Sequence, residues 1–117
     1  MVKWGVISTG TISKAFCDSI RYSKKGELVA VASRSSKNLK HFSDKYGVAT
    51  YDSYDALLKD SSIDAIYIGT PHNSHFDLSL KTLRCGKHLL CEKPMTMNST
   101  EAMILINEAR RFNLFFM

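Results

Sequence analysis

The sequence predicts an α/β fold, a doubly wound, Rossmann-type parallel sheet with helices on both faces. Short apolar segments of strand length alternate with segments whose apolar residues recur at helical spacing. One apolar segment, Leu28 to Ala32, contains no polar residue, which is typical of a strand covered on both faces. Such alternation predicts βαβ units and therefore parallel strands. The 117 residues suit one domain, which we place at residues 1–117.

The first half of the chain contains three predicted strand–helix pairs. Strands are expected at residues 2–8, 28–32 and 48–51. The first helix is expected to turn four apolar residues inward: Ile12, Ala15, Phe16 and Ile20. Gly47 stands where the second helix should end, and Ser53 where the brief third helix should begin.

The second half continues the alternation. Strands are expected at residues 63–69 and 88–91, and a sixth should begin at residues 114–117. Ser74 and Asp77 form the capping box of a helix that should bury Phe76, Leu80 and Leu83. Asn98 or Ser99 should cap the last helix, and its inward residues are expected to be Ala102, Met103, Ile106 and Ala109.

Composition and charge argue against several classes of protein. The net charge is +5, but basic residues are interspersed with acidic ones and lack interleaved aromatics, so nucleic-acid binding ranks last. No stretch approaches the roughly 20 apolar residues of a membrane span, and the N-terminus does not resemble a signal peptide. Three cysteines without a CxxC pair suit a reducing compartment, so we expect a cytoplasmic protein.

The first strand-to-helix turn resembles a dinucleotide-binding turn. In the pattern G-x-G-x-x-G/A, Ser8 replaces the first glycine, Gly10 is the second, and Ser13 takes the third place. The amides of Thr11 and Ile12 would face a pyrophosphate at the helix N-terminus. One glycine is weak evidence and is also compatible with a simple tight turn. Its position after the first strand and before the first helix favours dinucleotide binding.

The end of the second strand indicates which dinucleotide binds. Domains that prefer NAD carry Asp or Glu here for the ribose 2′-hydroxyl, whereas this chain has Ser33 and Arg34. A guanidinium beside hydroxyl groups suits a 2′-phosphate. We therefore predict NADP(H) as the cofactor and rank NAD(H) below it. The alternative is a polar loop that only caps the next helix.

Two further loops follow strands at the same edge. The first of these loops, residues 69–75, includes Thr70, Pro71 and His75. It also contains a second histidine, His72, but the two histidines have no third ligand nearby in the sequence, so we assign no metal. After the fifth strand, Lys93 is equally compatible with contacting a substrate hydroxyl and with an exposed pair with Glu92. Cys91 lies in a strand that should be covered on both faces, which favours a core position over a nucleophile.

Taken together, the motifs resemble the glucose-fructose oxidoreductase / inositol dehydrogenase / MocA family. The resemblance covers essentially the whole chain, and Glu-Lys-Pro after the fifth strand is the family's signature. The segments that carry it are residues 6–13, 30–34, 68–75 and 91–94. Tyr67 to Thr70, Leu90 to Pro94 and Asn98 are similar to members that oxidise trans-dihydrodiols of aromatic hydrocarbons and D-xylose.

The resemblance implies an NADP-dependent dehydrogenase that transfers hydride between the carbinol of a diol or sugar and the nicotinamide. It implies that Lys93 is the catalytic residue beside the nicotinamide, and that Glu92 orients the ribose or that lysine. Pyrophosphate contacts would come from Gly10, Thr11 and Ile12, and the adenosine phosphate would contact Arg34. Residues lining the cofactor cleft would be Thr70, Pro71 and His75.

Family members continue into a second α/β domain that carries the substrate pocket and usually the dimer interface. We therefore expect residues 1–117 to be the cofactor domain of a longer architecture, with little activity on its own and a homodimer only when the second domain is present. The alternative is a non-catalytic nucleotide-binding or protein-interaction module. Its partner surface would be the exposed sheet edge with Leu114, Phe115 and Phe116.

Overall fold

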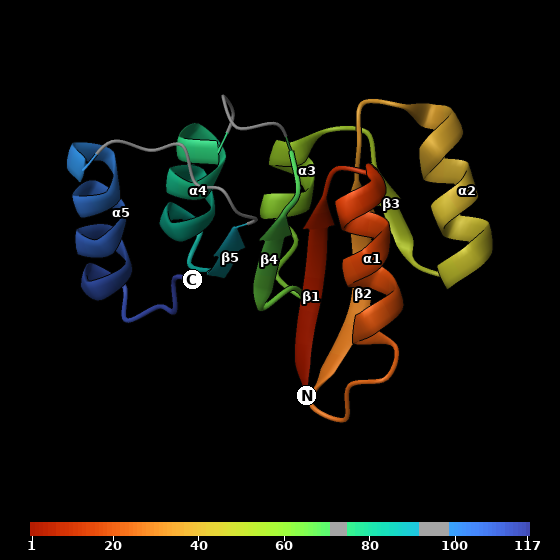
Figure 1. Cartoon of the computed structure of the whole chain (residues 1–117), viewed down its shortest axis with the longest axis horizontal. Helices are drawn as coiled ribbons and strands as arrows, with labels where there is room; N and C mark the ends of the chain where they lie inside the picture. The colour runs from red at the N-terminus through yellow and green to blue at the C-terminus, as the bar shows by residue number, and fades with distance from the viewer. Residues whose placement is uncertain (71–74, 92–98) are drawn as a thin grey trace.

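The computed structural model describes residues 1–70, 75–91 and 99–117, and within them it contains one five-stranded parallel sheet in the order β3-β2-β1-β4-β5. The strands are β1 (Val2–Ile7), β2 (Gly26–Ala32), β3 (Ala49–Tyr51), β4 (Ala65–Ile68) and β5 (His88–Cys91). The helices are α1 (Thr11–Ile20), α2 (Ser36–Tyr46), α3 (Tyr54–Leu58), α4 (His75–Arg84) and α5 (Ser99–Arg111). The predicted fold class is confirmed, because this order reverses direction between β1 and β4 as in a Rossmann sheet (Figure 1).

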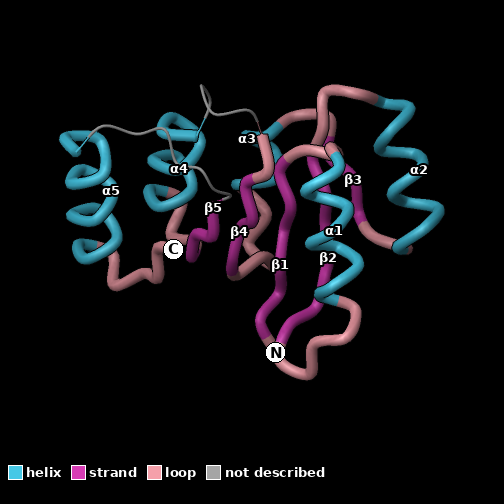
Figure 2. The backbone as a smooth tube through the Cα atoms, in the orientation of Figure 1, coloured by secondary structure: helices cyan, strands magenta, loops and turns pink. Residues whose placement is uncertain are grey.

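Helices cover both faces of the sheet (Figure 2). On one face, α1 and α2 pack over a core that includes Val6, Val31 and Phe42, each fully buried. On the other face, α3, α4 and α5 pack over an aliphatic core around Ile68 and Leu105. Alternate residues of β1 and β2 therefore face different cores, as the pleat of a strand requires.

The first helix differs from its prediction in the face that it buries. Ile12 is 48% exposed, whereas Ser13 and Cys17 are fully buried. The N-terminal turn of α1 lies close to the end of β4, and this close approach turns the small side chain of Ser13 toward the sheet. Phe16 is only partly buried and stacks on Tyr67 with ring centroids 4.1 Å apart. Burial raises the pKa of the Cys17 thiol to about 12, so this side chain packs as a neutral group.

The inward faces of α4 and α5 were also only partly predicted. In α4, Leu83 is buried as expected, but Phe76 and Leu80 are half-buried and polar Ser79 is fully buried. This helix lies between the sheet and α5, so it buries two sides instead of one stripe. In α5, Leu105 and Ala109 are buried, whereas Met103 is 52% exposed. An edge helix that packs mainly on one neighbouring helix needs only a narrow apolar stripe.

Several predicted helix ends are confirmed. Gly47 ends α2 in the left-handed conformation with φ of 64°, which a glycine adopts without steric cost. Ser53 caps α3, and its hydroxyl oxygen accepts a hydrogen bond of 3.3 Å from the Ala56 amide. The predicted caps Ser74 and Asn98 lie outside the described residues.

The last residues extend the sheet beside β5, as predicted for the start of a sixth strand. The Leu89 amide donates to the Phe115 carbonyl at 2.8 Å, and the Met117 amide donates to the Leu89 carbonyl at 3.0 Å. Leu89 and Phe116 form a parallel bridge. These bonds place residues 114–117 at the outer edge of the sheet.

The amino edge of the sheet is held together by polar contacts within the chain. Lys87 is 5% exposed, and its Nζ donates to the carbonyl oxygens of Asp60 at 2.7 Å and Ile63 at 2.8 Å. Hydrogen bonds from Ser62 and then Tyr51 hold the pKa of the Asp60 carboxyl at about 2. Within the described part of the chain, no helix is both long and apolar enough to cross a membrane.

Candidate functional site

The candidate site lies at the opposite edge of the sheet, where the strands end. The loops after β1, β2 and β4 all emerge at this edge because the strands are parallel. In open α/β sheets, ligands bind at this edge, at the point where the strand order reverses. In this chain the reversal lies between β1 and β4 (Figure 1).

The turn after β1 presents the N-terminus of α1 to solvent. Gly10, Thr11 and Ile12 are exposed, and no described side chain caps the helix at Gly10. The first amides of a helix lack partners within the helix and carry the positive end of its dipole. A Cβ on Gly10 would meet only the Ser8 hydroxyl, at 3.7 Å, so the backbone at Gly10 is open to an approaching ligand. The turn can therefore accept an anion.

Ser8 adopts a backbone conformation that favours glycine. Its φ is 95°, which non-glycine residues rarely adopt. The Ser8 hydroxyl oxygen accepts a hydrogen bond of 3.3 Å from the Gly10 amide. The serine that replaces the first glycine of the pattern thus retains the turn geometry and adds a side-chain bond within it.

Ser13 and Gly69 hold the turn against the end of β4. A Cβ on Gly69 would lie 2.4 Å from the Ser13 Oγ, and Ser13 is fully buried. The two small residues therefore permit the close helix–strand approach for which the third position of the pattern is kept small. This packing brings the first turn beside the loop that begins at Thr70.

The first two residues after β2 differ in burial, because Ser33 is buried and Arg34 is exposed. Ser33 is 6% exposed, exchanges a hydrogen bond of 3.0 Å with Thr9, and accepts another of 3.1 Å from the Ser35 amide. Its hydroxyl therefore links the first and second turns. Arg34 is exposed, and its guanidinium carbon lies 5.4 Å from the centroid of the Tyr54 ring. In the described part of the chain, no carboxylate forms an ion pair with Arg34.

The turn after β4 is described at its two ends. Thr70 is 8% exposed, and its carbonyl accepts a hydrogen bond from Nε2 of His75, which is 2% exposed. His75 thus contacts the backbone of the cleft-lining loop. The described residues contain no cluster of three metal-ligating side chains. Pro71, Glu92 and Lys93, which the sequence also places in the site, lie outside the described residues.

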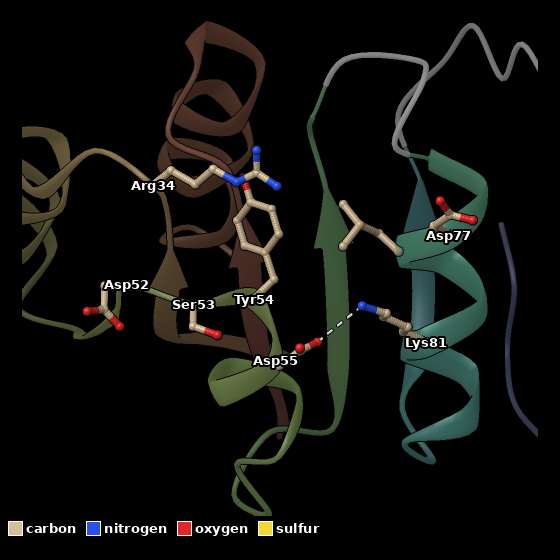
Figure 3. A pocket seen from close by; sticks show the side chains of 8 residues that line it. Arg34, Asp52, Ser53, Tyr54, Asp55, Asp77 and Lys81 are labelled. Carbon is tan, nitrogen blue, oxygen red and sulfur yellow. Dashed lines mark hydrogen bonds and ion pairs between the residues drawn. The ribbon is translucent and has the colours of Figure 1, made fainter.

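A hollow of about 610 Å³ adjoins Arg34 between α3 and α4 (Figure 3). Lys81 crosses it from α4 to Asp55 of α3 with an ion pair of 3.5 Å. Sequence reasoning missed Thr9 and Tyr54, although both follow strands that end at this edge. The lining residues are Arg34, Asp52, Ser53, Tyr54, Asp55, Asp77, Leu78 and Lys81.

Residues 2–117 match the sequence model of a protein family. This family is described as an oxidoreductase family with an NAD-binding Rossmann fold. The chain belongs to the Gfo/Idh/MocA family of oxidoreductases. The family resemblance read from the motifs is therefore confirmed, and the edge described above belongs to the NAD-binding fold of this oxidoreductase family.

Among curated relatives, trans-1,2-dihydrobenzene-1,2-diol dehydrogenase of Xenopus laevis is 42% identical over 118 residues, covering 98% of this chain and 36% of the relative. The D-xylose 1-dehydrogenase (NADP(+)) of Hypocrea jecorina is 35% identical over 133 residues, covering 99% of this chain and 33% of the relative. This Gfo/Idh/MocA chain thus spans about a third of the length of these relatives.

A solved structure of a 3-ketoreductase from Actinomadura kijaniata, in complex with NADP and TDP-benzene, superimposes with a TM-score of 0.95. It is 32% identical and covers 99% of this chain and 36% of its own. The described Rossmann architecture is therefore shared with a protein that was crystallised with NADP.

Proposed function

We propose that the chain binds NADP(H) at the carboxyl edge of its sheet, in preference to NAD(H). The observation that carries the proposal is Arg34, an exposed guanidinium at the end of β2 that forms no ion pair within the described part of the chain. A cation at this position suits the 2′-phosphate that distinguishes the two cofactors, whereas NAD-preferring domains carry an acid there. The xylose dehydrogenase and ketoreductase relatives, whose names include NADP, support the same choice.

Under this proposal each predicted residue has a role toward the cofactor. The exposed amides of Thr11 and Ile12, with the open backbone at Gly10, would hold the pyrophosphate, and Ser8 would hold the turn in shape. Ser33 would act indirectly, since its hydroxyl links the turn after β1 to the turn after β2, and the second of these turns contains Arg34.

The other predicted residues would lie beside the nicotinamide end of the cofactor. Thr70, Pro71 and His75 would line the cleft, with His75 holding the Thr70 carbonyl. We propose Lys93 as the residue that relays a proton to and from the substrate hydroxyl, with Glu92 orienting it or the ribose. The bound nicotinamide would exchange a hydride with the carbinol of a diol or sugar.

The reaction of the whole oxidoreductase is part of the same proposal. We propose that residues 1–117 supply the cofactor domain and that a second domain reads the diol or sugar. The curated relatives, named for a dihydrodiol and for D-xylose, support this substrate class. Nucleic acid and membrane are not proposed partners, and the cytoplasmic location stays a prediction.

A titration of the chain with NADPH, with NADH as the comparison, tests cofactor binding. We expect saturable binding with NADPH preferred, and we expect Arg34→Ala to weaken NADPH binding by about 1.5–3 kcal/mol, the range for hydrogen bonds to charged groups. Arg110→Ala, which removes an exposed arginine from the last turn of α5, is the matched control. Unchanged selectivity in Arg34→Ala would refute the proposal.

The alternative function is a protein-interaction module, favoured by the exposed apolar residues at the outer edge of the sheet. Phe115 is 72% exposed and Met117 is 68% exposed. We propose instead that the chain is monomeric and that the family's homodimer requires the second domain. Sedimentation velocity between low and high micromolar concentrations distinguishes the two. A constant monomer supports the cofactor domain, whereas concentration-dependent association supports the module.

A further inference from the structure

Arg34 lies over the face of an aromatic ring that the proposed function does not use. Its guanidinium carbon is 5.4 Å from the centroid of the Tyr54 ring (Figure 3). Arginine is long and flexible, and an exposed arginine on a loop loses much side-chain entropy when a phosphate orders it. A contact that orders the guanidinium before the ligand arrives reduces this loss.

Tyr54 is itself held in place from several sides. It is the first residue of α3, directly after the cap at Ser53, whose hydroxyl accepts from the Ala56 amide. Its ring is partly buried and packs against the aliphatic core. The next residue, Asp55, pairs with Lys81 of α4 at 3.5 Å. The helix cap and the contact with the core therefore fix the position of the Tyr54 ring, and the exposed Arg34 side chain lies over it.

The charges around the hollow explain why a neutral ring suits this position. Asp52, Asp55 and Asp77 line the same hollow as Arg34, and Asp55 is paired with Lys81. A carboxylate partner would occupy N–H donors of Arg34, whereas an aromatic face attracts the cation without using any of them. The donors of the guanidinium fork thus remain available for a phosphate.

We propose that Tyr54 is a positioning residue that increases the preference for NADP over NAD by holding the Arg34 guanidinium over its ring. The inference rests on the proposed function, in which Arg34 receives the 2′-phosphate. Tyr54 acts through Arg34, so its removal affects NADPH and leaves NADH binding unchanged.

The test compares ring removal with ring retention in the 117-residue chain, by titration with NADPH and with NADH. Tyr54→Leu removes the ring, and Tyr54→Phe keeps the ring and removes only the hydroxyl. We expect Tyr54→Leu to raise the Kd for NADPH about three- to fivefold, the effect of losing a cation–π contact to an exposed arginine. The Kd for NADH should stay within about twofold in both variants, and Tyr54→Phe should match the wild type. Tyr54→Met, whose flexible side chain fills irregular space, replaces Tyr54→Leu if the latter does not fold.

A double-mutant cycle with Arg34→Ala separates positioning from direct contact. In the Arg34→Ala background, Tyr54→Leu should change neither Kd further, because the group that it positions is gone. If Arg34→Ala removes the NADPH preference while Tyr54→Leu and Tyr54→Met keep it, the inference is wrong and the proposed function stands. If Arg34→Ala keeps the preference, the proposed function is wrong and the inference falls with it. An equal loss of NADPH and NADH binding in Tyr54→Leu would show a structural role and would also overturn the inference.

Discussion

The two edges of the parallel sheet differ in where their polar groups find partners. At the amino edge, the buried Lys87 donates to two backbone carbonyls, and Asp60 accepts from Ser62 and Tyr51. At the carboxyl edge, Arg34 and the first turn of α1 remain exposed, and Ser8 is held at a φ of 95°. The first arrangement stabilises the fold, whereas the second leaves donors available for a ligand.

This difference shows how one scaffold separates stability from binding. Buried polar groups that are bonded within the chain contribute to the free energy of unfolding, and their loss is costly. Exposed donors contribute little to stability, and unusual backbone conformations, which cost stability, cluster at functional sites. Changes at the amino edge should therefore affect unfolding, and changes at the carboxyl edge should affect cofactor binding first.

The largest effect on stability is expected from Lys87→Met at the amino edge. The change leaves the carbonyls of Asp60 and Ile63 without their charged donor, and we expect it to lower the free energy of unfolding by about 2–4 kcal/mol. Urea denaturation measures this, with Lys24→Met as the control because Lys24 is exposed at the same edge. The ratio of NADPH to NADH affinity should not change, and a changed ratio would contradict the separation of the two edges.

A smaller effect is expected at the carboxyl edge, from the backbone of Ser8. Alanine keeps the steric cost of positive φ and loses the hydroxyl that accepts from the Gly10 amide, whereas glycine adopts this φ freely. Ser8→Ala should therefore unfold more easily than Ser8→Gly by about 1 kcal/mol. Equal denaturation midpoints for the two variants would show that the turn does not hold Ser8 at positive φ in solution.

The smallest effect is the pH dependence contributed by Asp60. Its folded-state pKa of about 2 lies below the ordinary value of 3.8, because Ser62 and Tyr51 donate to the charged form. The stabilisation is therefore complete above pH of about 4 and is lost as the pH falls toward 2. We expect the free energy of unfolding of the wild type to exceed that of Asp60→Asn by less than about 1 kcal/mol above pH of about 4. This difference should disappear as the pH falls toward about 2. The control is Asp44→Asn, which removes an exposed carboxylate. In urea titrations from pH 6 to pH 2, its difference in stability from the wild type should stay the same.

Local signals account for the elements that were predicted correctly. Gly47 and Ser53 mark helix ends because the chemistry of a cap depends on one residue and its neighbours along the chain. The strand β2 follows from an uninterrupted apolar run. Ser13 as the small third residue of the glycine pattern after β1 follows from its spacing, and its burial against Gly69 agrees with that prediction.

The local sequence pattern could not predict which helix faces are buried, nor that the Tyr54 ring lies under Arg34. Ile12 continues an apolar period but is exposed, because the close approach of α1 to β4 turns Ser13 and Cys17 inward. Tyr54 follows β3 and lies twenty residues beyond Arg34 in the sequence, and only the parallel arrangement of β2 and β3 brings the two together. No single-residue signal predicts a contact between two loops.

The sequence by itself determined the fold class, the order of strands and helices, the glycine turn, the arginine at the end of β2 and the family. These follow from periodicity and short motifs, which are properties of neighbouring residues. Only the tertiary structure decided which helix faces are buried, how Ser33 joins Thr9, and that Arg34 lies over Tyr54. The physical reason is that packing and long-range contacts depend on where the sheet brings distant segments together, and that position is set by the whole chain.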